Sequence, residues 1–141
     1  MDKEQINKLA GLLGDNCSCV ICKGDMERHF YGRGVQDLYR LLKESPDFLK
    51  DAIIADKVVG KAAAVLMVLG GVKAVYTPLL SSLAVDVFAA NNVDVAYDQL
   101  VPHIINRDGT DWCPLEKRCN TLTDLSACKK QIDNFLKTAT N

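Results

Sequence analysis

Lys61 is the residue whose placement in this chain points most directly to chemistry. It opens an apolar run, Ala62 to Leu69, that reads as a helix. A cation in the first turn opposes the helix dipole, and the apolar residues that follow offer the ammonium no polar partner. A desolvated lysine can act as a base or as a Schiff-base nucleophile. The alternatives are an ion pair with Asp56 or an ammonium that extends into solvent.

Cys113 is a second candidate for a catalytic side chain. The sequence Asp-Trp-Cys-Pro-Leu-Glu places it at the start of a helix, with Pro114 in the first helical position and Glu116 in the first turn. Helix N-termini favour the thiolate form of cysteine, so the thiol could be reactive. A cysteine between tryptophan and proline can equally serve packing alone. The catalytic candidates are therefore Lys61, Cys113 and Glu116.

Several polar side chains could bind an anion beside Lys61. Hydroxyl groups at Thr77 and Ser81 flank the junction between a strand and a helix, and Asn106 and Arg107 lie in a polar loop. Arginine binds phosphate or carboxylate with two hydrogen bonds, and helix N-termini attract the same groups. The alternative for the loop is a solvated turn at Asp108-Gly109. The predicted ligand-binding residues are Asp56, Lys61, Thr77, Ser81, Asn106 and Arg107.

Helix and strand signals alternate along the chain and must position these residues. Strand, helix and strand in succession indicate a parallel crossover, and Gly24-Asp25 between two β-rich runs predicts a hairpin. Helices are expected at 6–13, 35–45, 57–69, 81–90 and 125–136, and strands at 17–23, 26–31, 72–76 and 93–97.

Composition fits one globular domain over residues 1–141, with an N-terminal helix in 1–14 and a C-terminal helix in 122–138. The 17 basic and 18 acidic residues alternate, so we expect neither nucleic acid nor an anionic membrane as partner. The N-terminus has no signal-like segment, and the longest apolar run is shorter than the roughly 20 residues that span a bilayer. A cytoplasmic protein that could form homo-oligomers is the expectation.

The six cysteines do not favour a metal knuckle or a disulfide framework. Cys17 and Cys19 would share one face of a strand, while Cys22 would lie on the other. Reduced, packed thiols are therefore expected, and no metal site. His29 and His103 are expected to be structural, because no neighbouring pattern defines a catalytic triad.

Four short motifs resemble Domain of Unknown Function family 1893, a family of uncharacterised bacterial proteins with a deaminase fold, over residues 17–136. They are Asp56-Lys57-x-x-Gly60-Lys61-Ala62-Ala63-Ala64, Tyr76-Thr77-Pro78, Ile105-Asn106-Arg107 and Cys113-Pro114-x-Glu116. The resemblance implies a cytidine-deaminase-like α/β fold, which is a three-layer α/β/α sandwich around a mixed five-stranded sheet. It also implies a site where two helices direct their N-termini into one crevice.

Zinc deaminases hold their metal in that crevice with a His or Cys on the first helix and two Cys on the second, and a Glu moves protons. The corresponding stretches here are Gly60-Lys61-Ala62-Ala63 and Pro78-Leu79-Leu80-Ser81-Ser82. They supply neither the three ligands nor the glutamate, so we expect no zinc-dependent deamination and no cofactor.

Two hypotheses on function follow. In the first, the protein binds a small anionic, nucleotide-like metabolite at the crevice around Lys61, with or without zinc-independent catalysis. In the second, the same fold serves as a non-catalytic regulatory or protein-interaction module.

Overall fold

The computed structural model describes residues 1–32 and 34–139, so the last two residues of the expected 1–141 domain lie outside it. Its centre is a mixed sheet of six strands. Along the sheet β2 pairs with β1, β1 with β3, and β3 with β5. β4 pairs with the same edge of β5 as β3, and β6 pairs with the opposite edge. The strands are β1 (Cys19–Lys23), β2 (Met26–Phe30), β3 (Ile53–Asp56), β4 (Val58–Val59), β5 (Ala74–Ser81) and β6 (Asp94–Val101).

The sheet has six strands and not the expected five, because Lys57 separates β3 from β4, which would otherwise form one strand beside β5. β3 and β4 both run parallel to β5, with Ala55 opposite Tyr76 and Val58 opposite Leu79. The helix predicted over 57–69 is accordingly wrong in its first turn, since Val58 and Val59 are in β4. β-Branched residues pack well on a pleated sheet, and the helix starts only after Gly60.

The helices otherwise follow the apolar periodicity of the sequence. The C-terminal helix, expected from residue 122, begins at Leu125, and β5, α5 and β6 form the predicted parallel crossover. The helices are α1 (Lys3–Leu13), α2 (Gln36–Glu44), α3 (Pro46–Leu49), α4 (Lys61–Leu69), α5 (Ser82–Ala90), α6 (Pro114–Cys119) and α7 (Leu125–Ala139).

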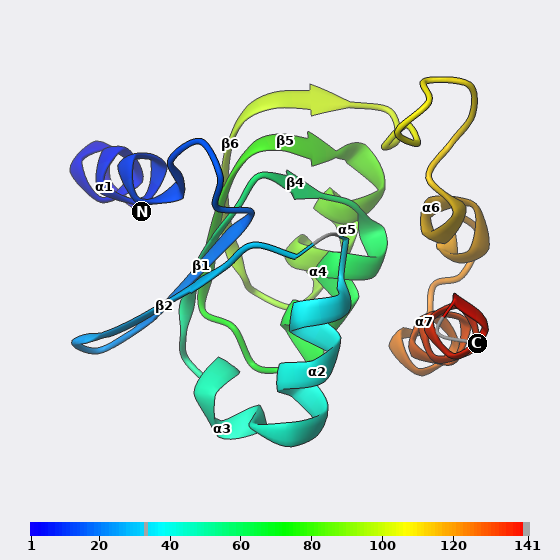
Figure 1. Cartoon of the computed structure of the whole chain (residues 1–141), viewed down its shortest axis with the longest axis horizontal. Helices are drawn as coiled ribbons and strands as arrows, with labels where there is room; N and C mark the ends of the chain where they lie inside the picture. The colour runs from blue at the N-terminus through cyan, green and yellow to red at the C-terminus, as the bar shows by residue number, and fades with distance from the viewer. Residues whose placement is uncertain (33, 140–141) are drawn as a thin grey trace.

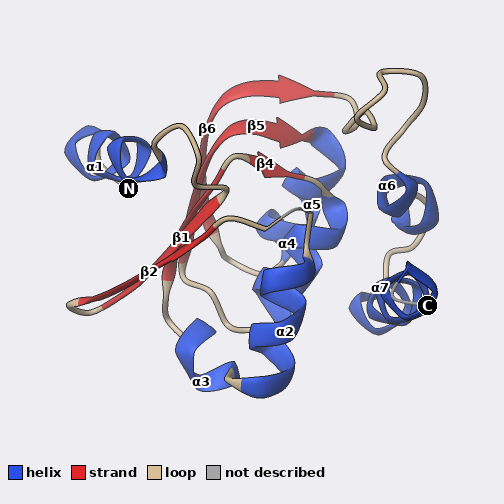
Figure 2. Cartoon of the chain, viewed as in Figure 1, coloured by secondary structure: helices blue, strands red, loops and turns tan. Residues whose placement is uncertain are grey.

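The helices cover the two faces of the sheet unequally (Figure 1). α1 alone packs on one face, where Leu9 and Leu13 join Val20, Ala55 and Tyr76 in a small apolar cluster. α2, α4 and α5 lie on the other face, and α6 and α7 pack against α4 on its outer side (Figure 2). A further tier of helices thus lies outside the layers that a simple three-layer sandwich predicts.

α4 lies at the centre of the larger core. Its residues from Lys61 to Met67 are all buried, because the sheet, α5 and the α6 and α7 tier surround it. No helix in the described ranges has both the length and the apolarity to cross a membrane. The buried position of α4 fixes the location of its N-terminus, where the candidate residues Lys61 and Glu116 lie.

Candidate functional site

Glu116 links the N-terminal ends of α4 and α5. Its side chain is 2% exposed, and one carboxylate oxygen accepts a hydrogen bond from the backbone N–H of Lys61 at 2.6 Å. The other oxygen accepts from the Ser81 hydroxyl at 2.6 Å and from the Ile104 N–H at 3.0 Å. Lys61 is the first residue of α4 and Ser81 is the N-cap of α5. A carboxylate from this chain therefore satisfies the positive ends of both helices.

This geometry changes the interpretation of the two-helix crevice. An external anion was expected where these N-termini meet, but the Glu116 side chain already supplies a negative charge there. The residues present also do not fit zinc, because no group of three His, Cys, Asp or Glu in the described part of the chain could hold a metal ion. The Ser81 hydroxyl and the Lys61 N–H therefore donate their hydrogen bonds to Glu116 and not to a ligand.

The Lys61 side chain has neither of the partners considered from the sequence. Its ammonium donates hydrogen bonds to the carbonyl oxygens of Leu122 and Asn120, the latter at 3.3 Å. These carbonyls lie at and beyond the C-terminal end of α6, where the helix dipole favours a cation. Lys61 is 8% exposed, so its charge is satisfied inside the protein. The contacts support a role in holding α6 and the connection to α7 on α4.

A pocket of about 710 Å³ lies next to this linkage, in front of the N-terminal ends of α2 and α4. Ala62 and Ala63 in the first turn of α4 line it, as do Val35 and Gln36 at the start of α2. Helix geometry gives the N–H groups of the first turn no carbonyl partner within their own helix. The pocket thus faces the first turns of two helices, and the N–H groups of Ala62 and Ala63 have no partner within α4.

The pocket brings together five of the eight predicted site residues. Those that line it are Asp56, Asn106, Arg107, Cys113 and Glu116. Lys61, Thr77 and Ser81 are not among its lining residues. Thr77 is fully buried, and its hydroxyl exchanges hydrogen bonds with the backbone of Leu79 at 3.0 and 3.2 Å.

Arg107 and Asn106 reach the pocket from the loop that follows β6. Arg107 is exposed and has no hydrogen-bond or ion-pair partner within residues 1–32 and 34–139. The Asn106 side chain accepts from the Thr110 N–H at 3.1 Å, which shapes the turn. The predicted turn is present, and it directs Arg107 to the rim of the pocket.

Asp56 supplies an ionisable group at the pocket wall. It ends β3 beside the interruption at Lys57. Desolvation raises the pKa of its carboxyl group to about 7, with a smaller contribution from the charge of Asp37, while hydrogen bonds from the backbone of Val58 and Lys57 oppose the increase. Asp56 can therefore take up or release a proton close to neutral pH.

Cys113 is half-buried and precedes α6, as the sequence predicts. Its N–H donates to the Ile104 carbonyl at 2.8 Å, which places the start of α6 beside the loop after β6. The same loop is fastened by the His103 ring, which stacks on Trp112 with 3.9 Å between ring centroids. Cys113 thus lines the pocket on a segment held by its neighbours.

Sequence reasoning missed the wall that Ser18, Gly34, Val35 and Gln36 contribute. No periodic pattern links these residues to α4, since their proximity depends on the packing of α2 beside it. It also missed the reason for Gly60. A Cβ atom at Gly60 would lie 2.9 Å from the Glu116 carboxylate, so the glycine allows the close approach of that side chain.

Comparisons with known proteins agree with this architecture. The model of a family described as "Domain of unknown function (DUF1893)", TM1506, matches residues 8–136. The crystal structure of a DUF1893 family protein, TM1506 from Thermotoga maritima, has a TM-score of 0.82 and 21% sequence identity, over 98% of this chain and 92% of that chain. RibD from Acinetobacter baumannii has a TM-score of 0.45 and 19% sequence identity, over 67% of this chain and 33% of that chain. No curated protein matched the chain.

Proposed function

Because the chain belongs to the DUF1893 family, whose description assigns no activity, we propose a function from the pocket itself. The protein binds a small anionic, nucleotide-like metabolite in the pocket in front of α2 and α4. The observation that carries the proposal is the convergence on one pocket of about 710 Å³ of two helix N-termini and of Arg107, which has no partner among the described residues. This location lies beside Glu116 and not around the Lys61 ammonium.

Hydrogen-bond donors on the pocket wall support a negatively charged group on the ligand. The N–H groups of Ala62 and Ala63 are free of intrahelical bonds by helix geometry, and both residues line the pocket. Arg107 adds a full positive charge at the rim and can bind a phosphate or carboxylate with two hydrogen bonds. The ligand's anionic group would lie between Arg107 and the first turn of α4.

The size and composition of the pocket support an organic body on the same ligand. Pockets of roughly 300–1,000 Å³ hold small metabolites. The wall is largely apolar, with Val35, Val58, Ile104 and Leu115 among its residues. A flat ring would pack on this wall, and the Asp56 carboxyl group could bind the ring's N–H groups or nitrogen atoms. A nucleotide combines these features.

We also propose that the fold is cytidine-deaminase-like. The antiparallel β1–β2 hairpin, the parallel β3, β5 and β6, and the paired N-termini of α4 and α5 support this relationship. In this interpretation Glu116 takes the place that a metal ion has in the zinc enzymes.

Zinc-independent catalysis would use Asp56 and Cys113, because both line the pocket and Lys61 does not. With a pKa of about 7, Asp56 could transfer a proton at neutral pH. The second candidate is a non-catalytic regulatory or protein-interaction module. Rapid alkylation of Cys113 that a bound nucleotide slows favours chemistry at the pocket, whereas a slow Cys113 thiol favours binding alone.

Calorimetric titration with orthophosphate and with adenosine, cytidine, guanosine and uridine monophosphates tests the proposal. We expect at least one nucleotide to bind, and Arg107→Gln to weaken it by about tenfold, the equivalent of a charge-assisted hydrogen bond. Lys130→Gln removes the same charge from the exposed surface of α7 and is the matched control. Equal binding by Arg107→Gln and the wild type would exclude this pocket as the anion site.

A further inference from the structure

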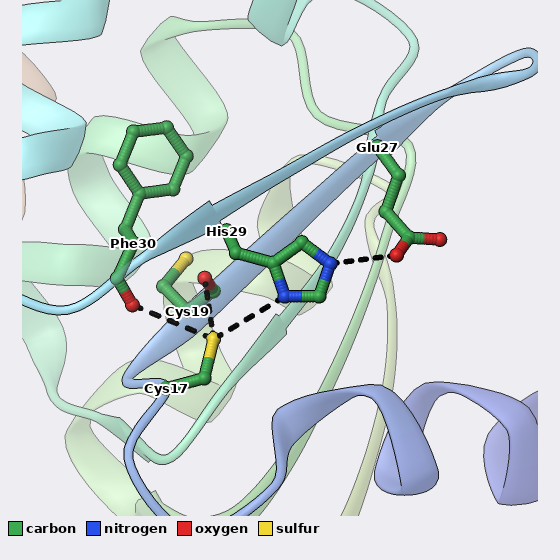
Figure 3. A network of polar contacts seen from close by, with 5 residues as sticks. All are labelled: Cys17, Cys19, Glu27, His29 and Phe30. Atoms are coloured by element: carbon green, nitrogen blue, oxygen red, sulfur yellow. Dashed lines mark hydrogen bonds and ion pairs between the residues drawn. The ribbon is translucent and has the colours of Figure 1, made fainter.

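We propose that Cys17, His29 and Glu27 form a second reactive site, in which the Cys17 thiol reduces a small peroxide. The site is independent of the proposed nucleotide pocket, because none of the three residues lines that pocket. Figure 3 shows the three side chains in sequence, with the imidazole between the sulfur and the carboxylate. His29 was predicted to be structural. The sequence alone does not show the contact with Glu27, because the two side chains come to one face only when β2 forms.

The distances form a relay of three groups. Cys17 Sγ lies 3.8 Å from His29 Nδ1, and His29 Nε2 lies 2.6 Å from a carboxylate oxygen of Glu27. Glu27 and His29 are two residues apart in β2, so their side chains share a face of the strand. Nucleophile, base and orienting acid within this reach are the geometric signature of an activated thiol.

The Glu27 contact sets the hydrogen position on the imidazole. A carboxylate only accepts hydrogen bonds, so Nε2 must carry the hydrogen that lies between them. In the neutral ring this leaves the lone pair of Nδ1 directed at the Cys17 sulfur. Glu27 is therefore a positioning residue, and His29 is the group that can take the thiol proton.

Two backbone carbonyls also lie within hydrogen-bond reach of the Cys17 thiol. The Cys17 sulfur donates to the carbonyl oxygens of Cys19 at 3.3 Å and Phe30 at 3.4 Å. A thiol has one hydrogen, so the S–H bond must turn from these oxygens toward His29 Nδ1 for the proton to move there as the sulfur bonds to its target.

The reaction with hydrogen peroxide balances with these groups alone. The sulfur attacks one peroxide oxygen, so that an S–O bond forms and the O–O bond breaks. The thiol proton passes to His29 and then to the departing hydroxide, which leaves as water. Cys17 is oxidised to a sulfenic acid and the peroxide is reduced.

Burial limits the reactant to a small, uncharged molecule. Cys17 is 5% exposed and packs with Leu9 and Leu13 of α1, whereas the His29 side chain is 33% exposed. A peroxide of two heavy atoms can approach along the exposed imidazole, and a larger thiol reagent would require α1 to move. The packing therefore favours oxidation by peroxide over disulfide exchange.

The experiment exposes the reduced full chain to limiting hydrogen peroxide, traps sulfenic acids with dimedone, and maps each cysteine by mass spectrometry. We expect Cys17 to be labelled ahead of Cys22 and Cys113, although both are more exposed. His29→Asn should lower the Cys17 to Cys22 labelling ratio by at least about tenfold, as expected for loss of a general base. His103→Asn, which removes the other histidine, should leave that ratio unchanged.

Glu27→Gln distinguishes activation from a structural effect. It should shift the pH profile of Cys17 labelling to lower pH without changing the profile of Cys22, because the imidazole loses the carboxylate that favours its protonated form. Labelling in the order of exposure, with Cys22 and Cys113 first, would overturn the proposal. An unchanged Cys17 to Cys22 ratio in both His29→Asn and Glu27→Gln would do the same, and that ratio remains measurable if a variant is less stable.

Discussion

The carboxylate of Glu116 lies 2.6 Å from the backbone nitrogen of Lys61. Through this contact the Glu116 carboxylate compensates the positive end of the α4 dipole. The same carboxylate accepts a hydrogen bond from the Ser81 hydroxyl, which links it to the start of α5. The charged side chains of Lys61 and Glu116 are satisfied within the structure. The groups that remain open to a ligand are those of the adjacent pocket.

Glu116→Ala should destabilise the protein strongly. The substitution leaves three donors without their acceptor, namely the buried Lys61 N–H and Ser81 hydroxyl and the partly buried Ile104 N–H. We expect a loss of about 3 kcal/mol or more in the free energy of unfolding, measured with urea. Glu44→Ala, at the exposed end of α2, is the control and should change stability by less than about 0.5 kcal/mol.

Lys61→Met tests whether the lysine is structural. Methionine keeps an apolar stem in the same space but leaves the carbonyls of Asn120 and Leu122 without their donor. The free energy of unfolding should fall by about 1–3 kcal/mol, while nucleotide affinity stays at the wild-type value. A variant of full stability that no longer binds would instead place the ammonium in the ligand site.

Gly60→Ala should be destabilising, and because Gly60 is the N-cap of α4 and not part of its helical turns, alanine gains nothing there from its helix propensity. The added Cβ would lie 2.9 Å from the Glu116 carboxylate and 3.2 Å from the side chain of Ile104. We expect a loss of about 1–3 kcal/mol in urea unfolding. Gly11→Ala in α1 meets no atom within 4 Å, so it should gain about 0.5–1 kcal/mol. Equal effects of both substitutions would contradict the close approach of Glu116.

Asp56 gives the stability of the protein a specific pH dependence. Its pKa rises from 3.8 to about 7 on folding, so the folded state holds this proton more tightly. The resulting stabilisation is complete below about pH 4 and is lost as the pH rises to 7. Asp56→Asn lacks this dependence. In urea unfolding between about pH 4.5 and 8, the wild type should lose stability relative to Asp56→Asn, and parallel curves would contradict the raised pKa.

Local sequence signals predicted most of the fold because they reflect the burial of individual segments. Leu9 and Leu13 repeat at helical spacing in α1, and Gly24-Asp25 joins β1 to β2. The start of α4 was misplaced because Val58 and Val59 lie just before the apolar run of that helix, and their strand pairing depends on β5, more than 15 residues away. Apolar runs alone do not distinguish a buried helix from a buried strand.

The candidate site was predicted in part, because the sequence gives residue types but not their partners. Arg107 and Asp56, which the sequence analysis proposes as ligand-binding residues, line the pocket. The carbonyls that bind Lys61 belong to Asn120 and Leu122, which follow it by 59 and 61 positions in the chain. Side-chain to backbone contacts over such separations leave no periodic signal. A cytoplasmic location, the lack of nucleic-acid and membrane partners, and homo-oligomer formation stay predictions.

The most direct test of the account is an NMR titration of the uniformly ¹⁵N-labelled protein with the four nucleoside monophosphates. We predict that a nucleotide that binds will shift the amide signals of Ala62, Ala63 and Arg107 in a saturable way, and that Arg107→Gln will need about ten times more nucleotide for the same shifts of Ala62 and Ala63. Saturable shifts confined to residues outside the pocket, or no shift with any of the four at millimolar concentration, would contradict the proposed function.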